Sequence, residues 1–223
     1  GPRSREVLTA CARGDWSKEA FPWLSVRECF IGFSPATVMS VSFSGELAYE
    51  IHVPNASLYA AYLALREAGK AFDMQIFGAR AVESMRMEKG FLHWKSDLIT
   101  EYDPYETGLD RFVKMEKGEF IGSSALRERQ VKGPTKKLVS LKIDSTSAPA
   151  HGGASLMESG RVVGTISSGE WGHRTGINIA YAFVEPNKAK IGSKMILDHL
   201  GEMVTAEVIE SAPYDPSFSR ILA

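Results

Sequence analysis

The feature that most constrains the fold is a series of short strand-like segments in the last third of the chain. Between Leu138 and Ile209 these segments are LVSLKI, ASLMES, RVVGTISS, INIAYAFV, KMILDHL and EMVTAEVI. Ser159-Gly160 and Leu200-Gly201 separate consecutive segments and are typical of hairpin turns. This many strands in so short a stretch favours a small closed barrel, because closure leaves no sheet edge exposed.

The first half of the chain mixes helical and strand patterns. SREVLTACA predicts a short opening helix, and RECFIGF, ATVMSVSF and AYEIHV predict strands. Two amphipathic helices follow, the first ending at Gly69. Their apolar positions are predicted to be Leu58, Ala61, Tyr62 and Leu65, then Gly78, Ala81, Val82 and Met85. The charged stretch ALRERQVKGPTKK predicts a linker. We therefore expect an α+β domain over residues 1–130 and an all-β barrel domain over residues 131–223.

Composition excludes several classes of function. The net charge of −1 and the pI near 6.6 give no reason to expect nucleic acid or an anionic membrane as a partner. No apolar run approaches the roughly 18 residues that a spanning helix needs, and the first residues lack a signal-peptide pattern. Cys11 and Cys29 lack CxxC spacing and predict reduced thiols. The five histidines are scattered, so we predict no metal site.

Glu50 interrupts the strand pattern of SFSGELAYEIHVP. Tyr49, Ile51 and Val53 alternate on one face, so Glu50 and His52 must face the other way, towards water or into a cavity. The pattern alone leaves two interpretations: an ordinary exposed glutamate, or a pocket carboxylate that accepts two parallel hydrogen bonds from a ligand with adjacent N–H donors.

Four further features are weaker candidates for function. The acids of WKSD and EYDPYE (Asp97, Glu101, Asp103 and Glu106) are expected to be solvated rather than catalytic. Arg80, Glu83 and Arg86 are spaced to form surface ion pairs. FLHW, residues 91–94, is expected to fill a core, with a stacking wall for a flat ligand as the alternative. SSGEWGHRTG, residues 167–176, is read as a Gly-rich loop able to cover a site, but not as a phosphate cradle.

Several motifs, in order and spacing, resemble the aminomethyltransferase family. They are GPRSREVL, FPWLSVRE, SFSGELAYEIHVP, FGARAVESMRMEKGFLHWKSDL, ETGLDRFVKMEKGEFIGSSAL and APYDPSFSR. This family includes the glycine-cleavage T-protein and the folate-binding domains of dimethylglycine and sarcosine dehydrogenases. MEKGFLHW and GLDRFVKMEKGEFIG are more similar to the dehydrogenases than to the T-protein.

The resemblance assigns expected roles to four residues. Glu50 matches the glutamate that holds the pterin ring of tetrahydrofolate, whose ring N–H and amino group form a donor pair. Phe43 and Phe91 stand where relatives carry tyrosine, so either ring can bound the pocket without a hydroxyl contact. The T-protein's folate-contacting arginine aligns near Val82. Arg80 lies about 200° around the helix from that position, so it stays a candidate that cannot take over the role unchanged.

The resemblance also implies what lies outside this chain. GPRSREVL occurs well inside the folate domain of relatives, so we expect the first third of the module upstream. The aspartate that relatives use near the folate nitrogen is expected there, which leaves the catalytic residue unknown. An FAD-binding domain of the same protein is likewise expected upstream, because no GxGxxG occurs here.

The expected function is capture by tetrahydrofolate of a one-carbon unit from a small methylamine, in the cytoplasm or the mitochondrial matrix. The module alone is expected to be inactive as a demethylase. Two alternatives stay open. One is a T-protein proper, for which a basic docking patch is expected. The other is a non-catalytic folate-binding or scaffold domain.

Overall fold

The computed structural model describes residues 1–223, which form two compact units. The first unit combines residues 1–89 with residues 214–223, and the second contains residues 90–213. No helix has the length and apolar character needed to cross a membrane. The predicted combination of an α+β region with a small β barrel is confirmed.

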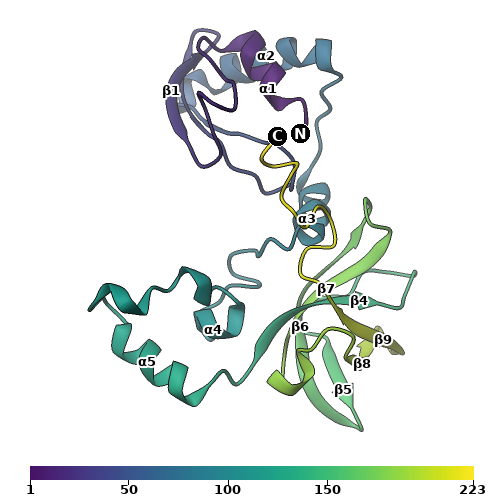
Figure 1. Cartoon of the computed structure of the whole chain (residues 1–223). Coiled ribbons are helices and arrows are strands. Elements are labelled where there is room, and N and C mark those ends of the chain that lie inside the picture. The colour runs from purple at the N-terminus through teal and green to yellow at the C-terminus, as the bar shows by residue number, and fades with distance from the viewer. The chain divides into compact units, whose positions relative to one another are not determined.

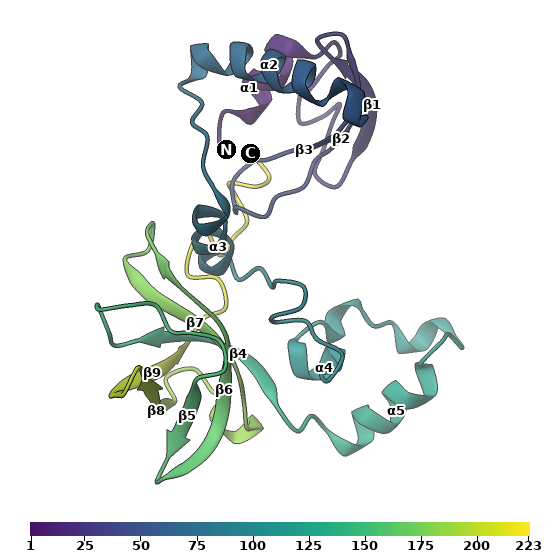
Figure 2. The same cartoon turned by 180° about the vertical axis from the view of Figure 1, so that it is seen from behind.

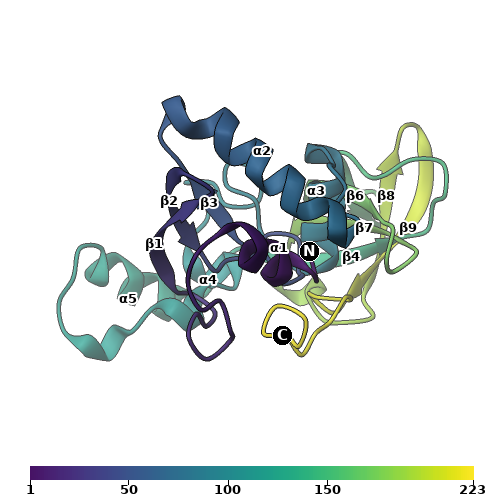
Figure 3. The same cartoon turned by 90° about the horizontal axis from the view of Figure 1, so that it is seen from above.

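The first unit contains a three-stranded antiparallel sheet, and two of its three helices pack on one face of that sheet (Figure 1). Its helices are α1 (Ser4–Cys11), α2 (Leu58–Gly69) and α3 (Ala79–Glu88), and its strands are β1 (Val26–Ile31), β2 (Ser34–Met39) and β3 (Glu50–His52). The strand order is β1-β2-β3. Helices α1 and α2 lie side by side, as the view from above shows (Figure 3). Their inner faces share one core with the sheet, built from residues such as Leu8, Trp16, Ile31, Val38 and Ala61.

The opening helix and the three predicted strands are present, although β2 ends at Met39 and residues 40–43 of ATVMSVSF are not strand. The helical faces differ from prediction. In α2, Leu58 and Tyr62 are exposed, whereas Ala61, Ala64 and Leu65 face the core. Small residues let the helix lie close to the sheet, and the apolar spacing could not show which of two overlapping stripes faces inward. In α3 the buried residues are Ser84, Arg86, Met87 and Glu88 instead of the predicted apolar positions. A pattern of apolar residues cannot reveal polar side chains that are buried with partners.

The second unit is built around a closed six-stranded barrel (Figure 2). Its strands are β4 (Lys137–Ile143), β5 (Ser155–Glu158), β6 (Arg161–Gly172), β7 (Ile177–Val184), β8 (Lys194–His199) and β9 (Glu202–Ile209), and it also contains helices α4 (Pro104–Thr107) and α5 (Ser123–Lys132). The order β4-β7-β6-β5-β8-β9 closes through antiparallel pairing of β4 with β9. All six strand segments read from the sequence form this barrel, with apolar residues such as Leu141, Leu156, Ile166, Val184 and Leu197 filling its interior.

Both predicted hairpin turns are present. Ser159 and Gly160 have φ angles of 50° and 77°, and Leu200 and Gly201 have 54° and 89°. Positive φ at both central residues is what a two-residue type I′ turn requires, since its twist matches that of the strands it joins.

Two predictions about irregular segments are wrong. The stretch interpreted as a linker contains α5, which Gly133 ends with a φ of 76°. Its charged residues are good helix formers and pair along the surface, as Lys132 does with Glu128. The Gly-rich segment at residues 167–176 is mostly strand: β6 continues to Gly172 and only the following residues turn towards β7.

Candidate functional site

Glu50 is the first residue of β3 and its side chain points away from the core. The register pairs Glu50 with Met39 and His52 with Thr37, so both polar side chains lie on the outer face of the sheet. The inner face is fixed by Tyr49, whose ring stacks on Phe21 with centroids 5.9 Å apart, and burial raises the pKa of the Tyr49 hydroxyl. The packing of its neighbours therefore turns Glu50 outward, as the alternation predicts.

The Glu50 carboxylate is accessible and partly engaged. Its side chain is 57% exposed, and Oε2 lies 3.3 Å from His52 Nε2. An open groove of about 450 Å³ adjoins His52. Its lining residues come from β1, β2 and the end of β3: Glu28, Cys29, Phe30, Pro35, Ala36, Thr37, His52 and Pro54. The arrangement can accept hydrogen bonds from a flat ligand with neighbouring N–H donors.

The other residues predicted for this site are distributed as follows. Phe43 is 36% exposed and lies in the loop that joins β2 to β3. Arg80 is exposed in the first turn of α3. Phe91 is half-buried and belongs to the second unit, whereas Glu50, Phe43 and Arg80 all belong to the first. The sheet thus brings His52 to Glu50, a partner that the sequence placed on the same face without a role.

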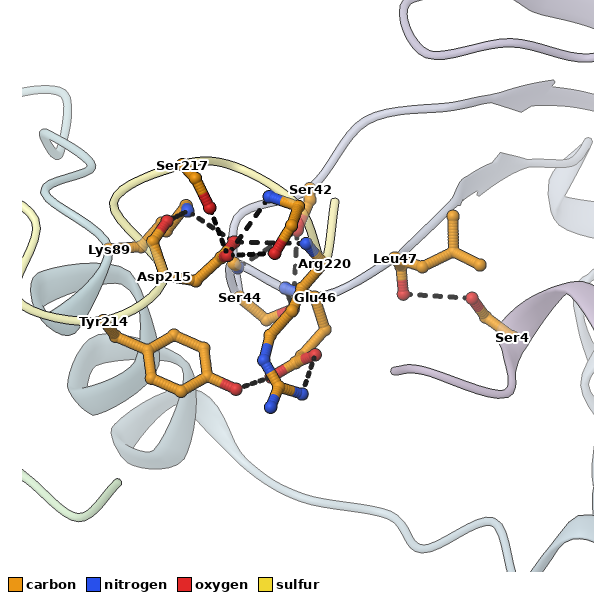
Figure 4. A network of polar contacts seen from close by, with 12 residues as sticks. Ser4, Ser42, Ser44, Glu46, Leu47, Lys89, Tyr214, Asp215, Ser217 and Arg220 are labelled. Atoms are coloured by element: carbon orange, nitrogen blue, oxygen red, sulfur yellow. Dashed lines mark hydrogen bonds and ion pairs between the residues drawn. The ribbon is translucent and has the colours of Figure 1, made fainter. Parts of the chain in front are cut away.

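A polar network beside the β2–β3 loop was not predicted (Figure 4). The Tyr214 hydroxyl donates to Glu46 Oε1 at 2.5 Å, and Arg220 Nη1 lies 3.6 Å from Glu46 Oε2. Lys89 Nζ lies 2.9 Å from Asp215 Oδ2. The motifs SFSGELAYE and APYDPSFSR contain all of these residues except Lys89, but nothing in their order shows that the two motifs touch.

Two acids expected to be solvated are buried in the second unit. Asp97 is fully buried and accepts hydrogen bonds from Ser167 Oγ and Ser168 Oγ, both at 2.6 Å, and from His93 N at 2.9 Å. Neighbouring strand residues normally point to opposite faces, but a register shift between Ile166 and Ser168 lets both hydroxyls reach one carboxylate. Asp97 therefore ties the segment before α4 to strand β6.

Glu106 is the second buried acid. Burial raises its pKa, but hydrogen bonds from the Thr135 hydroxyl and from the backbone N–H groups of Asp103, Thr135 and Lys136 together hold the pKa below its usual value. Asp103 caps α4 by accepting from Tyr105 N and Glu106 N, and Asp103 N in turn donates to Glu106 Oε2. Both acids thus accept hydrogen bonds from backbone donors around α4.

Two further predictions about side chains need correction. Arg86 is buried and pairs with Glu83 at 2.7 Å, so this ion pair is not a surface one. In FLHW, Trp94 is 69% exposed and therefore does not fill a core. A short aromatic cluster does not show which rings find a packing partner.

Known proteins resemble this chain over both of its parts. Residues 1–117 match the GCVT N-terminal domain, and residues 136–215 match the glycine cleavage T-protein C-terminal barrel domain. Mitochondrial dimethylglycine dehydrogenase of Homo sapiens is 30% identical over 211 residues, which are 94% of this chain and 24% of that protein. Mitochondrial sarcosine dehydrogenase of Mus musculus is 30% identical over 229 residues, covering 99% of this chain and 25% of that protein.

A solved structure has the same fold. The crystal structure of glycine cleavage system aminomethyltransferase T from Bartonella henselae matches with a TM-score of 0.75 at 24% identity, over 81% of this chain and 50% of that chain. The chain spans about a quarter of the length of the two dehydrogenases. With one domain model covering more than half of its residues and a second covering the barrel, the chain belongs to the glycine cleavage T-protein family of aminomethyltransferases.

Proposed function

We propose that this chain is the tetrahydrofolate-binding aminomethyltransferase module of an enzyme like the dimethylglycine and sarcosine dehydrogenases. A flavin domain elsewhere in the whole protein would oxidise a small methylamine to an iminium ion. Transfer of the one-carbon unit then joins the iminium carbon to N5 and N10 of tetrahydrofolate and gives 5,10-methylenetetrahydrofolate. The amine leaves as an ammonium ion that carries the two protons lost by those nitrogens.

The observation that carries the proposal is the outward-facing carboxylate of Glu50. It stands on a short strand whose other face is packed, so its exposure is set by the fold and not by a mobile side chain. A carboxylate accepts two parallel hydrogen bonds, and the pterin ring presents a matching pair of N–H donors. His52 contacts Oε2 of Glu50 and would hold the carboxylate in place, while Oε1 and the second lone pair of Oε2 stay available to the two donors of the ligand.

Phe43, Phe91 and Arg80 complete the proposed folate contacts. The two rings would bound the pterin by stacking, and the Arg80 guanidinium would face an anionic part of the folate. In this proposal residues 1–130 form the folate part and residues 131–223 form the barrel domain. Orientation and exclusion of water are the module's main contributions, since transfer to N5 and N10 is mainly a problem of proximity.

The test is calorimetric titration of the protein with 5-formyltetrahydrofolate, comparing wild type with Glu50→Gln. Glutamine keeps the shape of glutamate but replaces one acceptor with a donor, so we expect binding to weaken at least tenfold. The melting temperature should stay within about 2 °C of wild type, because the side chain makes no core contact. Glu67→Gln, an exposed glutamate on α2, is the matched control and should bind as wild type does. Equal affinities for wild type and Glu50→Gln would refute the assigned role.

The product of turnover separates this function from its alternatives. Incubation of the whole protein with a methylamine and tetrahydrofolate should yield 5,10-methylenetetrahydrofolate. Release of free formaldehyde at the same rate with and without folate would contradict transfer and favour a non-catalytic module.

A further inference from the structure

The last residues of the first unit fold back as a tail, residues 214–220, against the loop that leads to Glu50. Tyr214 N donates to Glu88 O at 2.9 Å, which fixes the start of the tail to the end of α3. From there the Tyr214 hydroxyl and the Arg220 guanidinium both reach Glu46, as Figure 4 shows. Glu46 lies on this loop, four residues before Glu50 at the start of β3.

Asp215 holds the tail in a single shape. Its carboxylate accepts from Ser219 N at 3.1 Å, from Ser219 Oγ at 2.6 Å and from Arg220 N at 3.2 Å. Asp215 and Phe218 have left-handed φ angles of 47° and 59°, which are unfavourable for a bulky residue such as Phe218 unless surrounding contacts impose them. The tail is therefore a built element and not a loose end.

Lys89 joins the tail to the loop. Its side chain is fully buried and its ammonium pairs with Asp215. Lys89 Nζ also lies 4.0 Å from the centroid of the Phe218 ring. The stem of Lys89 also packs on Gly45, where an added Cβ would come within 3.0 Å of Lys89 Cβ and Cγ. Gly45 has a φ of 79°, so glycine satisfies both the turn and the close approach.

The contacts that order residues 42–47 include several from side chains. Strand β2 ends at Met39 and β3 begins at Glu50, so neither ladder extends into this loop. Within it, Gly45 N donates to Ser42 Oγ and Glu46 N donates to Ser44 Oγ. Ser4 Oγ donates to Leu47 O at 3.0 Å, and the tail supplies the bonds to Glu46. The contacts of Tyr214 and Arg220 with Glu46 are thus among those that hold the loop between Phe43 and the start of β3.

We propose that Tyr214 and Arg220 are positioning residues that act through Glu46 to fix the loop presenting Phe43 and Glu50 to tetrahydrofolate. This inference rests on the proposed function and adds to it a dependence of the ligand site on the end of the chain. Neither residue needs to touch the ligand. Removing the Tyr214 hydroxyl would take away one of the contacts that hold Glu46, so the loop would sample other conformations more often and binding would have to select the competent one.

The test uses two variants of the whole protein, Tyr214→Phe and Arg220→Gln. Amide hydrogen exchange without ligand reports the loop, and titration with 5-formyltetrahydrofolate reports the site. We expect exchange at Gly45 and Glu46 to speed up about tenfold in Tyr214→Phe, with folate affinity about tenfold weaker and exchange in barrel strands unchanged. Arg220→Gln should move both readouts in the same direction by less. Tyr59→Phe, an exposed tyrosine on α2, is the matched control and should change neither.

The two readouts separate the possible failures. Unchanged loop exchange in Tyr214→Phe overturns the inference, and so does faster exchange with unchanged folate affinity, since the tail would then be purely structural. If wild type binds no folate, the proposed function fails and this inference fails with it. If Glu50→Gln binds like wild type but Tyr214→Phe weakens binding, the loop positions a different ligand contact.

Discussion

At the scale of single residues, Asp215 and Lys89 form a buried ion pair, and each charge is tolerated in the interior because the other is there. Their side chains are 5% and 0% exposed. Burial raises the pKa of Asp215, but the Ser219 hydroxyl, the Lys89 ammonium and the Arg220 backbone N–H stabilise the charged form and hold the pKa well below its usual range. A buried carboxylate is tolerated when charge and hydrogen bonds compensate for the water it loses.

This pair predicts how stability depends on pH. The pKa of Asp215 is lower in the folded protein than in the unfolded chain, so its contribution to the free energy of unfolding is complete above the unfolded value near 3.9 and declines as the pH falls. Asp215→Asn leaves Lys89 buried without its counter-charge and should cost about 3 kcal/mol at pH 7. Urea unfolding from pH 8 to pH 3 should show the difference from wild type shrinking below about pH 4.

Asp110→Asn serves as the control, because Asp110 is exposed in a short turn and should give a difference near zero throughout. A cost for Asp215→Asn that stays the same down to pH 3 would show that shape, and not charge, makes this residue necessary.

At the scale of elements, the sequence predicted those whose signals are local. Alternating apolar and β-branched residues predict the barrel strands, and Ser159-Gly160 and Leu200-Gly201 predict two of their hairpins. Helix α5 was not predicted, because its few apolar residues form no stripe that would distinguish it from a linker. The contact of Lys89 with Asp215 spans 126 positions in the chain, and no local pattern contains it.

The β8–β9 hairpin predicts a stabilising substitution. Leu200 is 70% exposed and holds a φ of 54°, which costs a leucine about 1–2 kcal/mol relative to residues suited to that conformation. Asparagine adopts this conformation more readily and, followed by Gly201, makes the preferred type I′ pair. Leu200→Asn should therefore raise the free energy of unfolding by about 0.5–1 kcal/mol, measured by chemical denaturation.

Leu63→Asn is the control for the change of residue type. Leu63 is a half-exposed position within helix α2, where asparagine should lower stability by a few tenths of a kcal/mol. A loss of stability in Leu200→Asn would mean that the exposed leucine makes contacts worth more than its backbone strain.

At the scale of the whole molecule, the chain leaves its first unit at Lys89 and returns to it at Tyr214. The sequence predicts a change from mixed to all-β structure near residue 130, where composition and periodicity change. It therefore predicts two consecutive domains, without a return of the chain to the first unit. A linear reading has no signal for a return, because the tail is too short to form an element with a pattern of its own. The β2–β3 loop before Glu50 is consequently completed by residues more than 160 positions away.

Because of this return, we expect removal of the last residues to lower the stability of the first unit, most of which is far from the cut in sequence. A chain ending at Pro213 loses the Asp215 partner of Lys89 and the contacts of Tyr214 and Arg220 with Glu46, which leaves the buried Lys89 ammonium without its counter-charge. The first unit should lose about 3–5 kcal/mol, while the barrel keeps its core and its closed ladder. Hydrogen exchange should show amides of α1, β1 and β2 losing protection by more than a hundredfold, with β4, β6 and β7 unchanged. A chain ending at Ile221 is the matched control, because it keeps the contacts of Tyr214, Asp215 and Arg220 with Glu46 and Lys89. It loses only the Leu222 N–Phe218 O and Arg5–Ala223 hydrogen bonds. Equal loss of protection in both units would show that the tail stabilises the whole molecule and not the first unit in particular. No loss in either unit would show that the tail does not stabilise the first unit.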